Sequence, residues 1–159
     1  MKRSVSVFVG LVVGLLFLSS FASAQHQHGG APAGGAMKME SKDVLVDGIK
    51  VSFTVMANEN HKKMLKDMNM KDDIEPGSTH NITVTLKDEK TQKEITDAQI
   101  NMKVVDPKGK DQVKPLKYEE SMKSYDAYFD LKEKGKYQVL ILFKVGEQKR
   151  TAGIYHEIK

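Results

Sequence analysis

The ten-residue segment HKKMLKDMNM, which begins at His61, holds the side chains of this sequence best suited to bind a metal ion. Residues three and four apart are neighbours on a helix, so a helix here places four side chains on one face: His61, Met64, Leu65 and Met68. Met70 extends the set as Met-x-Met. Thioether sulfur is a soft ligand that suits Cu(I), and imidazole also binds copper. The segment therefore predicts a copper site with His61 as the nitrogen ligand and three methionines as sulfur ligands.

Packing is the alternative interpretation of the same segment, because methionine also fills irregular gaps in protein cores. Besides the methionines, only Leu65 and Ile74 are apolar between His61 and Ile74, so the segment is poor core material. Its other side chains are mostly charged and favour water: Lys62, Lys63, Lys66, Asp67, Lys71, Asp72 and Asp73. If the methionines all point into the core, the metal hypothesis fails.

Four further histidines are distributed over the sequence, and three of them are candidate ligands. His80 follows the segment at the start of a predicted strand and could complete the site, although it shares a strand face with Ile82 and could equally be structural. His26 and His28 lie in a Gly-rich stretch and form a candidate metal-collecting arm. A different hypothesis assigns Zn(II) or Ni(II) to these two histidines and gives the methionine segment no role. His156, beside apolar neighbours in the last predicted strand, is expected to be structural.

Residues 1–24 have the features of a signal peptide. Lys2 and Arg3 precede the apolar stretch Val5–Phe21, and Ala22-Ser23-Ala24 is a small-x-small cleavage pattern. We therefore expect a periplasmic or secreted protein without a membrane span after processing. An uncleaved single-pass anchor is the alternative, because the apolar run approaches the length of a span.

Composition and charge exclude several classes of function. Without Lys2 and Arg3 the count of Lys and Arg falls from 25 to 23 against 21 Asp and Glu, a net charge of +2 that gives no basic face for nucleic acid. The sequence has no cysteine, which excludes disulfides, thiolate metal sites and cysteine nucleophiles. It also contains no G-x-S-x-G, H-E-x-x-H, P-loop or EF-hand motif, so we expect a protein that is not an enzyme.

From residue 42 to the end, apolar residues alternate with polar ones over short runs separated by turn signals such as Asp47-Gly48 and Pro107-Lys108-Gly109. This pattern predicts an all-β fold for residues 42–159, an antiparallel immunoglobulin-like β-sandwich of about seven strands. Tyr137–Val145 is the most apolar strand, and both of its faces are expected to be covered. Residues 25–41 read as a flexible tail, and the methionine segment as a loop or short helix inserted between residues 57 and 79.

The stretch EPGSTHNITVTLKDEKTQKEITDAQINMKVVDPKGK, Glu75–Lys110, resembles the YtkA-like and FixH-like domains of bacteria. The shared pattern is a Pro-Gly turn, an alternating strand, a polar link and a second strand that ends in Pro-x-Gly, and the resemblance extends over Val51–Val145. It implies a small exported or membrane-anchored sandwich whose relatives are associated with copper delivery and cytochrome oxidase assembly. The fold is also similar to that of periplasmic copper-resistance carriers with Met-rich loops, which implies Met68 and Met70 as ligands.

The sequence is compatible with two functions. The first is an exported protein that carries or sequesters Cu(I) through Met and His ligands in a loop, and passes it to another periplasmic or membrane protein. The second is a non-catalytic protein-interaction module without metal, in which the Met-rich loop is an adaptable contact surface. A metal site requires several Met and His side chains at one place, whereas an interface requires an exposed apolar patch.

Overall fold

The computed structural model describes residues 41–159, and the predictions for the signal peptide and for His26 and His28 lie outside this range. Eight strands and one helix make up the described residues: β1 (Ser41–Val46), β2 (Ile49–Ala57), α1 (Asn58–Asp67), β3 (His80–Asp88), β4 (Gln99–Val105), β5 (Asp111–Glu119), β6 (Ser124–Phe129), β7 (Gly135–Val145) and β8 (Gln148–Ile158). No helix among them is long and apolar enough to cross a membrane.

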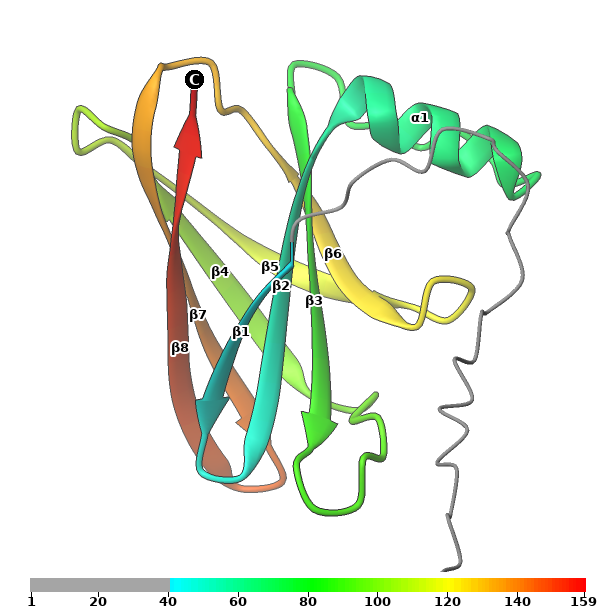
Figure 1. The fold of residues 1–159 in the computed structure, drawn as a ribbon, viewed down its shortest axis with the longest axis vertical. Coiled ribbons are helices and arrows are strands. Elements are labelled where there is room, and N and C mark those ends of the chain that lie inside the picture. Colours follow the sequence, from blue (N-terminus) through cyan, green and yellow to red (C-terminus); the bar gives the residue numbers. More distant parts are fainter. Residues whose placement is uncertain (1–40) are drawn as a thin grey trace, which may run out of the picture. The chain divides into compact units, whose positions relative to one another are not determined.

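All eight strands pair antiparallel in one continuous order, β1-β2-β3-β6-β5-β4-β7-β8 (Figure 1). β5 pairs with both β6 and β4 and so joins the two halves of the sheet. The outermost strands also approach each other, since the Lys42 ammonium donates a hydrogen bond to the Tyr155 carbonyl at 2.6 Å. The sheet is therefore nearly closed into a barrel.

The all-β antiparallel prediction is confirmed, but the strand pairing does not show a seven-stranded immunoglobulin-like sandwich. The difference arises at β5, where only Val113 and Leu116 suggested a short, weak strand. The structure extends this strand over nine residues, and its pairing with both neighbours makes the sheet continuous.

Strand alternation directs one row of side chains from each strand into a single core. On β7 the inward row is completely or almost completely buried: Tyr137, Val139, Ile141 and Phe143. The outward residues Leu140 and Leu142 remain 41% and 45% exposed, so the expectation that both faces of this strand are covered is wrong for the described chain.

Helix α1 follows β2 without a linker and lies at one end of β2 and β3 (Figure 1). Its buried residues are His61 and Leu65, one turn apart on the same face. The helix ends in a Schellman arrangement: Asn69 has a positive φ of 56°, its N–H donates to the Lys66 carbonyl at 3.0 Å, and the Met70 N–H donates to the Leu65 carbonyl at 2.8 Å. Because the chain reverses at Asn69, residues after it leave the face that carries His61.

Candidate metal site

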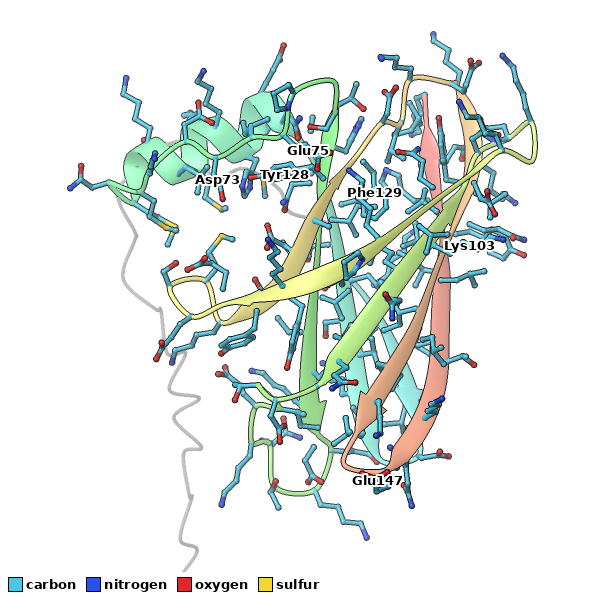
Figure 2. The ribbon with its side chains drawn as sticks, turned by 180° about the vertical axis from the view of Figure 1, so that it is seen from behind. Asp73, Glu75, Lys103, Tyr128, Phe129 and Glu147 are labelled. Carbon is cyan, nitrogen blue, oxygen red and sulfur yellow. The ribbon has the colours of Figure 1, made fainter. Side chains whose placement is uncertain are left out.

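A pocket of about 280 Å³ lies between helix α1 and the outer face of the sheet. Four methionines and one histidine line it, together with small polar residues: Met56, His61, Met64, Met68, Met122, Thr54, Asn81, Thr83, Thr85, Ser121 and Ser124. We call the first five of these the Met/His cluster. In Figure 2 sulfur atoms are visible between α1 and the turn that joins β5 and β6.

Three separate parts of the chain supply the Met/His cluster. Helix α1 contributes His61 and Met64, and Met68 follows as its C-cap residue; the three share a face because they are three and four residues apart. Met56 is on β2, on the same outward face as Thr54 and opposite to the buried Phe53. Met122 lies in the turn between β5 and β6, where Lys123 has a positive φ of 49°.

His61 is the most deeply buried member of this cluster, with 1% of its surface exposed. Neither of its ring nitrogens has a hydrogen-bond partner among the described residues. Its ring meets the Tyr128 ring edge to face, with centroids 5.6 Å apart. Burial lowers the pKa of His61, and the nearby carboxylates Asp126, Asp73 and Asp72 oppose that shift only in part. The imidazole is therefore neutral at neutral pH, the state in which it binds a metal.

A layer of hydrogen-bonded polar residues lies close to the His61 ring. The Tyr128 hydroxyl donates to Asp73 Oδ1 at 2.8 Å, and Figure 2 shows these two side chains adjacent beneath α1. Asn81 donates through Nδ2 to Asp126 Oδ2 at 2.8 Å. Burial raises the pKa of both Asp126 and Tyr128. The first bond ties the loop after α1 to β6 and holds the aromatic ring against which His61 packs, and the second links β3 to β6.

The chemistry of the donors selects among metals. In the described part of the chain, no three or more His, Asp and Glu side chains form a group that could hold a metal ion. A hard-donor site of the kind that Ca²⁺, Mg²⁺ or Mn²⁺ prefers is therefore not found there. The pocket instead offers uncharged thioether sulfurs and one neutral imidazole, which fit Cu(I).

The structure brings together only part of the predicted ligand set. His61, Met64 and Met68 line the pocket, whereas Met70 lies in a separate groove with Leu65, the contact that accompanies a Schellman motif. His80 is also outside the pocket: its Nδ1 lies 2.9 Å from the Thr79 hydroxyl, and burial lowers its pKa. His26 and His28 are outside the described residues.

Met56 and Met122 also line the pocket, although the predicted ligand set does not include them: the sequence makes Met56 a weak candidate and gives Met122 no visible partner. A signal for Met56 was present, because its strand phase places it opposite Phe53 and Val55, immediately before the helix. Met122 had no such signal, since only the pairing of β5 with β6 brings its turn to the pocket.

These observations define a class: an antiparallel, nearly closed all-β domain with a Met/His-lined pocket on its outer face. No protein-family model matches the chain, and no curated protein matches it. Among solved structures, FetP of uropathogenic Escherichia coli strain F11, expressed recombinantly in the periplasm of E. coli, is similar with a TM-score of 0.58, 11% identity, and coverage of 77% of this chain and 97% of that chain.

Two further solved structures share the fold. A copper-bound variant of the same FetP gives a TM-score of 0.57 at 11% identity and covers 76% of this chain and 97% of its own. A DUF4426 family protein of Pseudomonas aeruginosa PAO1 gives 0.54 at 17% identity and covers 74% and 94%. At these identities the similarity shows the fold alone.

Proposed function

We propose that this protein binds one Cu(I) ion in the Met/His cluster and acts outside the cytoplasm as a copper carrier or sequestering protein. The observation that carries the proposal is His61. It is 1% exposed, has no partner for either ring nitrogen, and lines the same pocket as four methionine side chains.

A buried polar group without a partner costs about 1–3 kcal/mol, so His61 is an expensive residue for a packing role alone. A metal ion bound to one nitrogen would replace the missing interaction. Cu(I) is the ion of choice because thioethers favour it and because the cluster brings no negative charge. The copper-bound FetP structure of the same fold supports this choice, as does the resemblance to YtkA-like domains.

The exposure of the ligands supports a role in transfer. Met68 is 47% exposed, whereas His61 is buried. A ligand at the mouth of the pocket lets an incoming donor or acceptor share the ion before the deeper ligand releases it. Another periplasmic or membrane protein with similar ligands is the proposed partner, and the predicted signal peptide supports that location. The proposed role is binding and delivery rather than catalysis.

The test is a Cu(I) titration under a competing chromophoric chelator, with single Met→Leu variants of the exported protein. Leucine conserves volume, so the variants should fold. We expect one Cu(I) per chain and weaker binding after substitution of Met56, Met64, Met68 or Met122. Met70→Leu is the matched control, because Met70 comes from the same segment but lies outside the pocket. Absence of binding, or loss in Met70→Leu alone, would reject the proposal.

A further inference from the structure

A second surface, separate from the Met/His cluster, carries exposed apolar residues on the outer face of β5, β4, β7 and β8. Val113, Leu140, Leu142 and Tyr155 are between 41% and 62% exposed. They line a shallow groove of about 770 Å³ that shares no residue with the pocket beneath α1. We call it the β4–β8 face.

Strand register assembles these residues into adjacent rows. Lys103 on β4 lies between Val113 on β5 and Leu140 on β7, and Leu140 in turn faces Gly153 on β8. In the next row Asn101 faces Leu142, which faces Thr151. The rows therefore form a continuous surface across four strands rather than scattered single residues, and contiguous apolar patches of this kind mark interaction sites.

The charges on this surface fit a partner that is itself uncharged. Lys103 is the charged residue among those that line the groove, and its ammonium lies 2.7 Å from an Asp111 carboxylate oxygen on the adjoining strand. Lys136 lies at the margin of the face, with its ammonium 5.5 Å from the centroid of the Tyr155 ring. The central rows carry no other charged side chain among the residues that line the groove, so a second copy can pack against them without burying an unpaired charge.

The area also fits a second copy. The four strands are 7 to 11 residues long. At about 3.3 Å per residue and 4.8 Å between strands, their full length presents a face of roughly 600 Å² at most. Two such faces would bury at most roughly 1,200 Å² in total, the lower end of the range for specific protein–protein interfaces.

We propose that two copies of this protein associate through their β4–β8 faces, sheet against sheet about a two-fold axis, with the Leu140 and Leu142 rows at the centre. Both Met/His clusters then remain accessible, because the pocket that holds each of them is lined by β2, β3, β6, α1 and the β5–β6 turn. The interface is of low-end size, so we expect a dissociation constant in the micromolar range.

Sedimentation equilibrium of the exported protein from about 1 to 500 µM tests the proposal. We expect the weight-average mass to rise toward twice that of one chain, and Leu142→Lys to weaken association at least about tenfold, since it places an unpaired charge in the centre. Leu45→Lys is the matched control: Leu45 is 56% exposed on β1 and does not line the groove. It should leave association unchanged.

Val113→Lys, at a 62% exposed position, serves as the second variant in case Leu142→Lys does not fold by far-ultraviolet circular dichroism. A protein that stays monomeric throughout the concentration range overturns the proposal. It is equally overturned if the lysine variants in the groove associate as well as the parent, or if Leu45→Lys weakens association to the same extent.

Discussion

Replacement of His61 by leucine should make the metal-free protein more stable and its copper binding weaker. Two buried ring nitrogens without partners each cost about 1–3 kcal/mol, and leucine removes both. The edge-to-face contact with Tyr128 is lost, which returns about 1 kcal/mol. The net expectation is a gain of about 1–5 kcal/mol in the free energy of unfolding.

For a domain of this size such a gain corresponds to a rise in the melting temperature of at least about 4 °C. The copper affinity should fall by more than about 100-fold, because loss of even an outer-shell partner of a metal ligand costs about 10- to 100-fold. Urea unfolding of the metal-free protein and chelator-competed Cu(I) titration measure the two quantities on the same sample. A residue that serves packing alone would not move them in opposite directions.

His80→Leu is the matched control, because the His80 ring is hydrogen-bonded to Thr79 and lies outside the pocket. It should not stabilise the protein, and it should leave the copper affinity within about threefold. The reasoning is refuted if His61→Leu lowers the stability of the metal-free protein by more than about 1 kcal/mol, since its nitrogens would then have partners. It is also refuted if that variant keeps the parental affinity for Cu(I).

Three other measurements test separate parts of the structure. Burial holds the pKa of His61 in the folded protein below its value in the unfolded chain, so the unfolded chain takes up the proton first as the pH falls. The free energy of unfolding and the Cu(I) affinity should therefore both fall as the pH drops below about 6.5. In His61→Leu the free energy of unfolding should fall less steeply with pH. Gly153→Ala should lower the free energy of unfolding in urea by about 1 kcal/mol, because its Cβ would lie 2.5 Å from Leu140 Cδ2 and 3.1 Å from the Val139 carbonyl oxygen. Leu140→Ala in the same chain should restore the part of that loss that comes from the leucine contact. Tyr125→Phe should lower the free energy of unfolding by about 2 kcal/mol and leave copper binding unchanged. The buried Tyr125 hydroxyl accepts a hydrogen bond from the Ala98 N–H at 2.9 Å and donates one to the Ile95 carbonyl at 3.0 Å, both in the segment between β3 and β4.

Local pattern in the sequence was sufficient to place the strands but not to join them. Alternating apolar residues predicted the strands that begin at His80 and Tyr137 close to their observed bounds, because one face of each is buried. The near closure of the sheet depends on pairing between distant segments, such as β3 with β6, and on β5, whose outward residues blur the alternation. Neither the pairing of distant strands nor the role of β5 can be predicted from the pattern of a short stretch of sequence.

The lining of the pocket was predictable from sequence where helix geometry determines which side chains share a face. Spacing alone placed His61, Met64 and Met68 on one face, and the pocket contains all three. Met70 was included because Met-x-Met resembles a ligand pair, but Asn69 before it is a residue that readily takes the left-handed conformation and so ends the helix. Attention to that C-terminal signal would have assigned Met70 to the contact with Leu65 instead.

The choice of residue at position 61 argues for a function more strongly than the methionines do. A ten-residue helix is too short to be stable alone and depends on the side chains it buries, which here are Leu65 and His61. Leucine at both positions would hold the helix more firmly, and methionines alone would still fill the pocket. A histidine whose nitrogens are buried and unpaired lowers stability, and natural proteins accept such a loss at functional sites. The proposed Cu(I) ion would account for an imidazole at this position.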